Sequence, residues 1–544
     1  MRFISLDSDK DNRWKVISDL APCLSSAWVR RLRFGGNSPD NKRTGLDAVV
    51  RGVLVEPGYV CRDYRNLYSN FYSKKFAESS PFCTRLHFFS EANLDVKDIC
   101  YDPEKHQNSY IGYSVIQPIA HHCIGRTVID PRKCCFSMPI FCLRTEEEVT
   151  IRGAKYTVCG FPFISQSDEV MVCSHAALWS TTRYLSEKHN VYAELKPFDL
   201  IQMTGDSNGR RYPNRGMLSD DYSSILTKFG SHPIVLHPYI RDVKKGIPYE
   251  KATPDKETLL EISSYLESGL PVLASFSGHV INLVGHTLYP KHEVINVLNN
   301  SVQNGYGFYD SYDILRHYIV VDDNFFPYQK LGDVSEKNIE DNYALGAYAN
   351  QLPKGLGKST IYVAVIPVPE KVFMTSRAAS GTAQRFFYNE MYRQYGDYCR
   401  QHNTTPSLDK NATVKYYLDK FLYNQSQDDD NSSTEYRLIV RPFLTSSKAF
   451  KVQKNLDFRR NGDTGSLFPT AVSLPHFVWV VEFTTAGLYN DEKVLGEVVL
   501  DANAYKSNSP ILYARMLDRI ILEGDVRKVS EKIFTLFRHN LGRR

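Results

Sequence analysis

The sequence lacks the long apolar segments that would insert it into a membrane or mark it for export. No run approaches the roughly 20 apolar residues of a membrane-spanning helix. The N-terminal segment, MRFISLDSDKDNRW, lacks the apolar core of a signal peptide. We therefore expect a cytoplasmic protein without a membrane span.

An excess of charge of one sign is also missing. The 544 residues carry a formal net charge of only +5, so the composition gives no support to the binding of nucleic acid or of an anionic membrane. The 11 cysteines are an odd number spread along a long chain, which fits a reducing compartment better than a disulfide framework. The remaining composition, 42% hydrophobic and 23% charged, is typical of a soluble globular protein.

Histidine and cysteine cluster between residues 121 and 142, but without the spacing that is typical of a metal site. The cluster comprises His121, His122, Cys123, Cys134, Cys135 and Cys142. Zinc sites usually take ligands in pairs two to four residues apart, whereas adjacent side chains in a strand point to opposite faces. We interpret these cysteines as ordinary buried thiols, and we expect neither a metal nor another cofactor.

The length and the pattern of helical and strand-like runs predict an α+β protein of three units. Residues 1–150 are expected to form an N-terminal accessory α/β unit, residues 151–370 the central unit, and residues 371–544 a C-terminal accessory α/β unit. The polar segment at 424–435, QSQDDDNSSTE with its preceding Asn, is expected to be a mobile loop. Glu482 lies within an apolar strand-like run, where a buried carboxylate could be functional. We interpret it instead as a paired residue on a sheet edge.

What the chain does contain is a cysteine at the start of a predicted helix. The segment from Ser165 to Leu185, SQSDEVMVCSHAALWSTTRYL, predicts a polar loop that ends at Cys173, followed at once by a helix with apolar residues at helical spacing. The unpaired N–H groups and the dipole of a first helical turn favour a thiolate over a thiol. Because the thiolate is the nucleophilic form, Cys173 is the candidate nucleophile.

A base, an orienting acid and an amide follow from the same part of the chain. His279 begins the strand-like run HVINLVG, and Asp322 follows the run YIVV. Neighbouring strands would place these two side chains together, so that the acid holds the imidazole that activates the thiol. Gln166 lies seven residues before Cys173, where its amide can stabilise an oxyanion.

This order of motifs resembles the papain-like cysteine peptidases, and most closely the bacterial branch that processes bacteriocin leader peptides. That branch has a glutamine, then Cys-Gly-x-Ala at a helix start, Gly-x-Pro-Val before a strand, Gly-His at the next strand, and Asp-Pro after a further strand. The matching stretches are Gln166, Cys173–Ala176, Gly269–Val272, Gly278–Gly285 and Asp322. The resemblance covers the central unit only.

The resemblance implies a fold and a role for each matching residue. The central unit would be a papain-like peptidase domain flanked by the two accessory units. Cys173 would be the nucleophile, His279 the general base, and Asp322 the group that orients the imidazole. Gln166 would line the oxyanion hole together with the backbone N–H of Cys173.

Two positions depart from the family pattern. Ser174 replaces the usual glycine after the nucleophile, which can alter how a substrate backbone lies beside the thiol. Asp323 and Asn324 stand where the family has proline, so it stays open whether Asp322 or Asp323 faces His279. We favour Asp322 because it directly follows the strand.

Three other polar residues near these motifs are interpreted as structural. His286 is seven residues from His279 in the same strand, hence on the opposite face and roughly 23 Å away. His175 is expected to point away from the cleft, although it could perturb the thiol. Asn282, within the strand, is expected to satisfy a neighbouring backbone group rather than to bind substrate.

The sequence thus predicts a cysteine peptidase that hydrolyses a peptide or isopeptide bond through an acyl-enzyme. The same thiol could instead transfer the acyl group to an amine or deamidate glutamine, since only the acceptor differs. A catalytically silent papain-like module that binds a peptide in the cleft is an alternative of another class. We expect a peptide or protein substrate, and accessory units that select it or bind a protein partner.

Overall fold

The computed structural model describes most of the chain. The described residues are 1–6, 49–119, 122–133, 140–167, 169–204, 216–247, 255–276, 279–325, 327–331, 361, 363–420, 436–460, 473–504, 510–516, 519–522, 525–528 and 534–535. The predictions made for His121, Cys134, Cys135, Gly278 and the segment 424–435 lie outside them. Among the helices of the described residues, none is long and apolar enough to cross a membrane.

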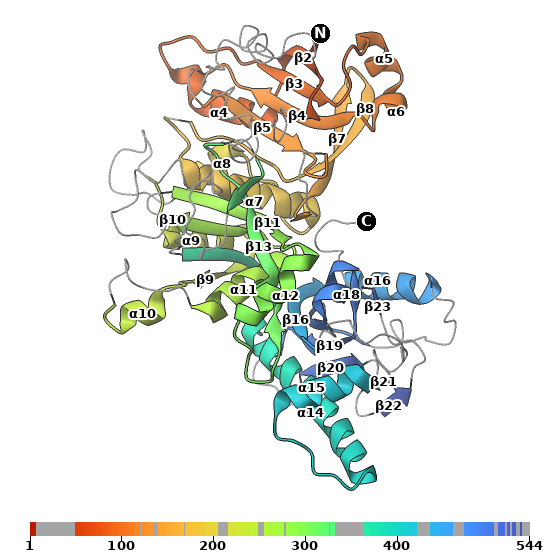
Figure 1. Ribbon diagram of the computed structural model, residues 1–544. Coiled ribbons are helices and arrows are strands. Elements are labelled where there is room, and N and C mark those ends of the chain that lie inside the picture. Colours follow the sequence, from red (N-terminus) through yellow and green to blue (C-terminus); the bar gives the residue numbers. More distant parts are fainter. Residues whose placement is uncertain are drawn as a thin grey trace. The chain divides into compact units, whose positions relative to one another are not determined.

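The described residues form two compact units, each built from discontinuous segments (Figure 1). Unit 1 comprises Met1–Asp255, Leu270–Thr287 and Arg316–Pro369, and unit 2 comprises Lys256–Gly269, Leu288–Leu315 and Glu370–Arg544. Both contain helices and sheets, which confirms the α+β class. A papain-like central domain stays a prediction.

These two units do not coincide with the three predicted ones. The expected boundary near residue 150 falls within strand β7, Thr145–Ile151. The N-terminal strands share one hydrophobic core with Trp179 and Val280 of the central segment. The N-terminal and central segments therefore belong to one compact unit. The last passage from unit 1 to unit 2 lies between Pro369 and Glu370.

Unit 1 begins with an antiparallel sheet of five strands that pair in sequence order. The strands are β1 (Arg2–Ser5), β2 (Gly52–Tyr59), β3 (Cys83–Phe89), β4 (Tyr110–Ile116) and β5 (Ile124–Ile129). The connecting helices are α4 (Arg62–Asn70), η1 (Tyr72–Lys74), α5 (Val96–Tyr101) and α6 (Pro103–His106). The hairpin of β7 and β8 (Ala154–Gly160) follows, and Arg152 and Gly153 make its turn with positive φ angles of 47° and 96°.

A second sheet carries the C-terminal part of unit 1, with the strand order β14-β13-β11-β10-β15-β9 and β6 paired to β11. The strands are β6 (Ile140–Cys142), β9 (Ser231–Leu236), β10 (Val272–Phe276), β11 (His279–Leu288), β13 (Leu315–Val321), β14 (Gln329–Leu331) and β15 (Val363–Pro369). The helices are α7 (Cys173–Lys188), α8 (Pro197–Met203), α9 (Ser219–Phe229) and α10 (Ile240–Lys244). Strand β11 is buried from His279 to Thr287, as expected of a continuous apolar run.

Helix α7 is buried on every side. All residues from Ser174 to Leu185 are buried, and the helix packs against both β7 and β10. A helix with no exposed face belongs to a core, and its polar groups must be satisfied internally. Arg183 and the indole N–H of Trp179 both donate to the buried Asp63 carboxylate of α4, at 2.9 and 3.3 Å.

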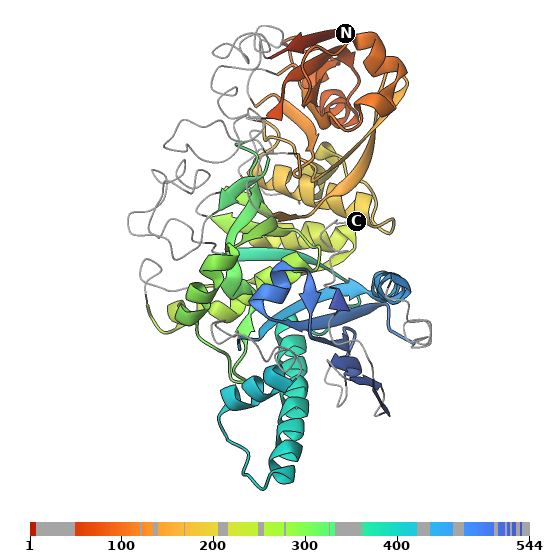
Figure 2. The same cartoon turned by 45° about the vertical axis from the view of Figure 1, so that its right-hand side comes forward.

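Unit 2 is built on a sheet with the order β12-β16-β17-β19-β20-β21-β22. The strands are β12 (Tyr309–Asp310), β16 (Ile439–Ser446), β17 (Phe477–Thr484), β19 (Gly496–Asp501), β20 (Ile511–Met516), β21 (Arg519–Leu522) and β22 (Asp525–Lys528); β18 (Lys493–Val494) and β23 (Phe534–Thr535) form a separate pair. The helices are α11 (Lys256–Glu267), α12 (Lys291–Asn300), η3 (Ser311–Ile314), α14 (Ser376–Gln401), α15 (Lys410–Leu418), α16 (Ser447–Arg460) and α18 (Ala486–Asn490). The long helix α14 is prominent in both views (Figure 1, Figure 2).

Glu482 of unit 2 is paired, as predicted, but it does not lie on a sheet edge. Its strand, β17, pairs with β16 and β19, so the prediction of an edge position was wrong. Strand order is set by long-range pairing, which the local sequence does not report. Arg441 of β16 donates to Glu482 at 2.7 Å and to Glu267 of α11 at 2.6 Å, and all three side chains are at most 4% exposed.

Replacing Arg441 by methionine tests this buried cluster. Arg441→Met leaves Glu267 and Glu482 buried without their cation, so we expect the free energy of unfolding of unit 2 to fall by roughly 3–5 kcal/mol. Arg393→Met on α14 removes an arginine whose side chain is half exposed and should change it by less than about 1 kcal/mol. Hydrogen exchange of β16 and β17 peptides across a urea series gives the comparison, and equal losses in both variants would contradict it.

Candidate active site

The candidate nucleophile occupies the first residue of α7, as the sequence predicted. Val172, just before it, is extended with φ −102° and ψ 173°, and the helix begins at Cys173. The loop before it is organised by Ser167, whose hydroxyl accepts from the backbone N–H groups of Val170 and Met171 at 3.2 and 3.0 Å. The thiol residue is half-buried at the end of this turn, so a small reagent can reach it.

The His175 side chain forms a hydrogen bond with the backbone at the start of its own helix. Its Nδ1 accepts from the backbone N–H of Val172 at 3.4 Å, and the residue is fully buried. Burial lowers the pKa of His175 to about 4, so the ring is neutral at physiological pH. It therefore adds no positive charge beside Cys173, and its contact with Val172 agrees with a structural role.

Asn282 of β11 forms hydrogen bonds with α7. Its side-chain N–H donates to the carbonyl of Ala177 at 3.0 Å, and its carbonyl accepts from the Thr181 hydroxyl at 3.0 Å. Both ends of the amide are thus satisfied within a core where an unpaired polar group would be costly. The prediction that Asn282 serves a backbone group is confirmed, and the contact holds the helix of Cys173 against the strand of His279.

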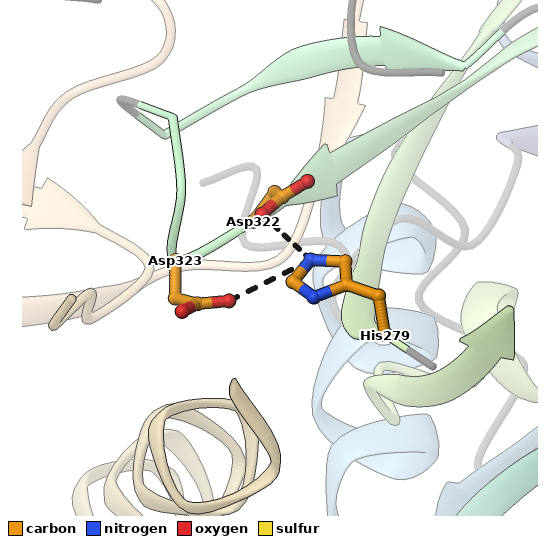
Figure 3. A group of neighbouring side chains, drawn as sticks. All are labelled: His279, Asp322 and Asp323. Atoms are coloured by element: carbon orange, nitrogen blue, oxygen red, sulfur yellow. Dashed lines mark hydrogen bonds and ion pairs between the residues drawn. The ribbon is translucent and has the colours of Figure 1, made fainter. Parts of the chain in front are cut away.

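His279 and Asp322 meet at the ends of neighbouring strands, β11 and β13. The His279 Nε2 lies 2.9 Å from Asp322 Oδ1, and Asp323 Oδ1 lies 3.6 Å from the same nitrogen. Figure 3 shows both carboxylates directed at that nitrogen. Asp322 Oδ1 also accepts from the Asn324 backbone N–H at 2.9 Å. Asp322 is therefore the hydrogen-bonded partner of His279, as favoured, while Asp323 is a second close carboxylate.

The charges around His279 hold it in the protonated form. Burial by itself would lower the pKa of the imidazole, but the Asp322 carboxylate, a hydrogen bond with the Cys173 side chain and the Asp323 carboxylate together raise that pKa well above its ordinary value. Cys173 thus approaches His279 from α7, while the carboxylates approach it from the turn after β13. The three predicted triad residues come together.

Gln166 reaches the same turn. Its side-chain N–H donates to the Asn324 side-chain oxygen at 3.0 Å, and Asn324 in turn donates its backbone N–H to Asp322. A role for Gln166 in an oxyanion hole stays a prediction. Sequence reasoning noted Asn324 only as a departure from the family pattern and gave it no role, although its position directly after the two aspartates was a signal for one.

The other predicted residues of this region lie apart from the cluster. His286 stacks on Phe141 of β6 with ring centroids 4.9 Å apart and is buried. Cys123 and Cys142 are buried thiols, as interpreted from the sequence, and burial raises the pKa of Cys142. His121, Cys134 and Cys135 lie outside the described residues.

His279, Asp322 and Asp323 are also close enough for one ion to reach all three. Each offers one ligand atom, and these atoms lie within 4.8 Å of one another. Imidazole and carboxylate are ligands that zinc accepts. In the geometry observed, however, Nε2 lies at hydrogen-bond distance from Asp322, which is the arrangement of an acid–base pair.

Comparison of the chain with protein-family models, with curated proteins and with solved structures found no match. The chemistry of the cluster must therefore be argued from its own geometry.

Proposed function

We propose that this protein is a cysteine peptidase in which Cys173, His279 and Asp322 act as nucleophile, base and orienting acid. The observation that carries the proposal is the position of His279, which is hydrogen-bonded to the Asp322 carboxylate at 2.9 Å and lies near enough to the Cys173 side chain for Cys173 to raise its pKa. A thiol, an imidazole and a carboxylate in this order are the parts of an activated nucleophile. The resemblance of the motif order to papain-like peptidases agrees with it.

The roles follow from which imidazole nitrogen each partner uses. Because Nε2 faces Asp322, Nδ1 is the atom that holds the proton of the Cys173 thiol, and the raised pKa of His279 keeps the resting pair as thiolate and imidazolium. The thiolate then attacks the carbonyl carbon of a peptide or isopeptide bond. The resulting imidazolium gives its proton to the departing amine, which leaves a thioester on Cys173.

Hydrolysis completes the cycle. His279, now neutral, removes a proton from a water molecule that attacks the thioester carbonyl, and the carboxylic acid departs as the thiol is restored. The oxyanion of each tetrahedral intermediate needs donors. The backbone N–H of Cys173 and the amide of Gln166 are the groups proposed for it, and Asn324 would hold that amide through its hydrogen bond.

Selective alkylation of Cys173 tests the nucleophile. With limiting iodoacetamide at pH 6, an ordinary thiol is almost wholly protonated, and burial raises the pKa of competitors such as Cys61, to about 11, and Cys142. We expect Cys173 to label at least about tenfold faster than the other cysteines, by mass spectrometry of tryptic peptides. The advantage should disappear in His279→Ala and persist in His232→Ala, an exposed histidine of the same unit. Cys173 reacting no faster than the rest would point to the peptide-binding module instead.

Two substitutions at Asp322 separate orientation from charge. Asn can still accept from the imidazole N–H, and papain-like enzymes use Cys-His-Asn, so Asp322→Asn should retain alkylation and peptide cleavage within about tenfold. Asp322→Ala removes the acceptor and should lose roughly a hundredfold or more. Cleavage of a peptide library, read by mass spectrometry, gives the comparison. Equal losses in both variants would show that Asp322 acts through something other than orientation.

Metal removal tests the alternative use of the same three side chains. Because the proposed chemistry needs only protein groups, dialysis against a chelator should leave the alkylation rate of Cys173 and any peptide cleavage unchanged. The control is the same protein with one equivalent of zinc restored after dialysis. Loss of activity on chelation, with recovery on restoring the metal, would replace the triad with a metal-dependent mechanism.

A further inference from the structure

Two consecutive carboxylates approach one imidazole nitrogen, although successive residues of a strand point to opposite faces. Strand β13 ends at Val321, and the backbone then turns, with the Phe325 N–H donating to the Asp322 carbonyl at 3.0 Å. The turn places Asp322 Oδ1 at 2.9 Å and Asp323 Oδ1 at 3.6 Å from His279 Nε2 (Figure 3). Only one carboxylate is needed to orient an imidazole, so Asp323 needs its own explanation.

Asp323 is almost entirely removed from solvent and poorly satisfied. Its side chain is 3% exposed. Neither carboxylate oxygen has a hydrogen-bond partner of good geometry within the described part of the chain, although the backbone N–H groups of Gln166 and Asp323 lie near enough to lower its pKa. A small space beside it is lined by Ile164, Ala176, Ala177, Ser180, Val280, Asn282 and Val321. These neighbours, from α7, β11, β13 and the loop before α7, carry no charge. The titratable groups that face Asp323 are His279 and Asp322, and His279 in turn interacts with the Cys173 side chain.

We propose that Asp323 is a second positioning residue for His279, sharing with Asp322 the imidazolium that forms when Cys173 gives up its proton. This inference rests on the proposed function and adds to it the control of the histidine's charge. Asp322 supplies the hydrogen bond and sets the direction of the ring. Asp323 adds negative charge at the same nitrogen without a hydrogen bond, and so favours the protonated form.

The contribution of Asp323 to the negative charge beside His279 depends on pH. Burial, together with repulsion from Asp322, raises the pKa of Asp323 to about 7, while His279 opposes the rise. Below that pH Asp323 becomes neutral and Asp322 holds the imidazolium alone. Above it Asp323 is charged, in the range where an ordinary histidine would already have lost its proton. The second carboxylate therefore extends the thiolate–imidazolium pair to higher pH.

Asp323→Asn tests the proposal because it keeps the size of the side chain and removes the charge. The His279 titration is followed by NMR in protein carrying ¹³C-labelled histidine, in a Cys173→Ala background so that the thiol does not contribute. The His279 signal is identified by its absence in His279→Gln. We expect the midpoint to fall by roughly one to three pH units in Asp323→Asn. Glu104→Gln, which removes an exposed carboxylate of unit 1, should leave it unchanged.

The second readout uses the reactive thiol. In the protein with Cys173 intact, the pH profile of Cys173 alkylation should have its upper inflection, which marks loss of the imidazolium, at lower pH in Asp323→Asn than in wild type. Asp323→Ala should move it in the same direction. A structural role alone would lower the stability of the variant without moving the His279 midpoint or this inflection.

The two proposals fail in different ways. If the titration midpoint of His279 in both Asp323 variants stays within about 0.3 pH unit of the midpoint without the Asp323 substitution, the proposed role of Asp323 is overturned. This holds even if Cys173 is alkylated rapidly and the protein cleaves peptides. A midpoint that falls as expected supports the charge coupling. If Cys173 is then unreactive in wild type, the coupling stands and the peptidase proposal fails.

Discussion

The hydrogen bonds between Asn282 and helix α7 are the constraint on which the candidate site depends. Cys173 and His279 come from parts of the chain about a hundred residues apart, and each is placed by a rigid element. Asn282 joins those elements by accepting from Thr181 and donating to Ala177. Since a buried amide that loses its partners costs more than a typical hydrogen bond contributes, this contact restricts α7 and β11 to one relative position.

Burial of α7 makes this constraint effective. The helix has no exposed face between Ser174 and Leu185, and its Arg183 is held by Asp63 of α4. A side chain on such a helix cannot be displaced without disturbing the core. At the start of α7 only Cys173 is less than fully buried. The arrangement suits a nucleophile, since a reactive group needs a rigid element that holds it in place and a side that substrate can reach.

Electrostatic interactions determine the protonation state of the His279 imidazole. Taken from water into this site, a histidine would lose its proton more readily, but two carboxylates and the Cys173 side chain reverse that tendency. The same low dielectric that penalises an isolated charge strengthens the attraction between opposite ones. The site is thus a small network in which the charge of each member depends on the others. Unit 2 contains a network of the same kind in Glu267, Arg441 and Glu482, where the charges are fully enclosed.

The sequence by itself determined the elements that carry the candidate site. The helix start at Cys173, the strand start at His279 and the strand end before Asp322 follow from local patterns of apolar residues and from the residue types that end them. Where a helix or strand begins and ends depends mainly on a few neighbouring residues, and for this reason the local patterns predicted these three boundaries. The ordered motifs also placed Gln166 on the loop before Cys173.

Only the tertiary structure decided which side chains meet. It made Asp322 the hydrogen-bonded acid, brought Asp323 to the same nitrogen, and tied Gln166 to Asn324. It also merged the N-terminal strands with the central segment into one core and put Glu482 inside a sheet rather than on its edge. Each of these outcomes depends on the path of a turn or on pairing between distant strands, and neither is encoded in the spacing of residues along the chain.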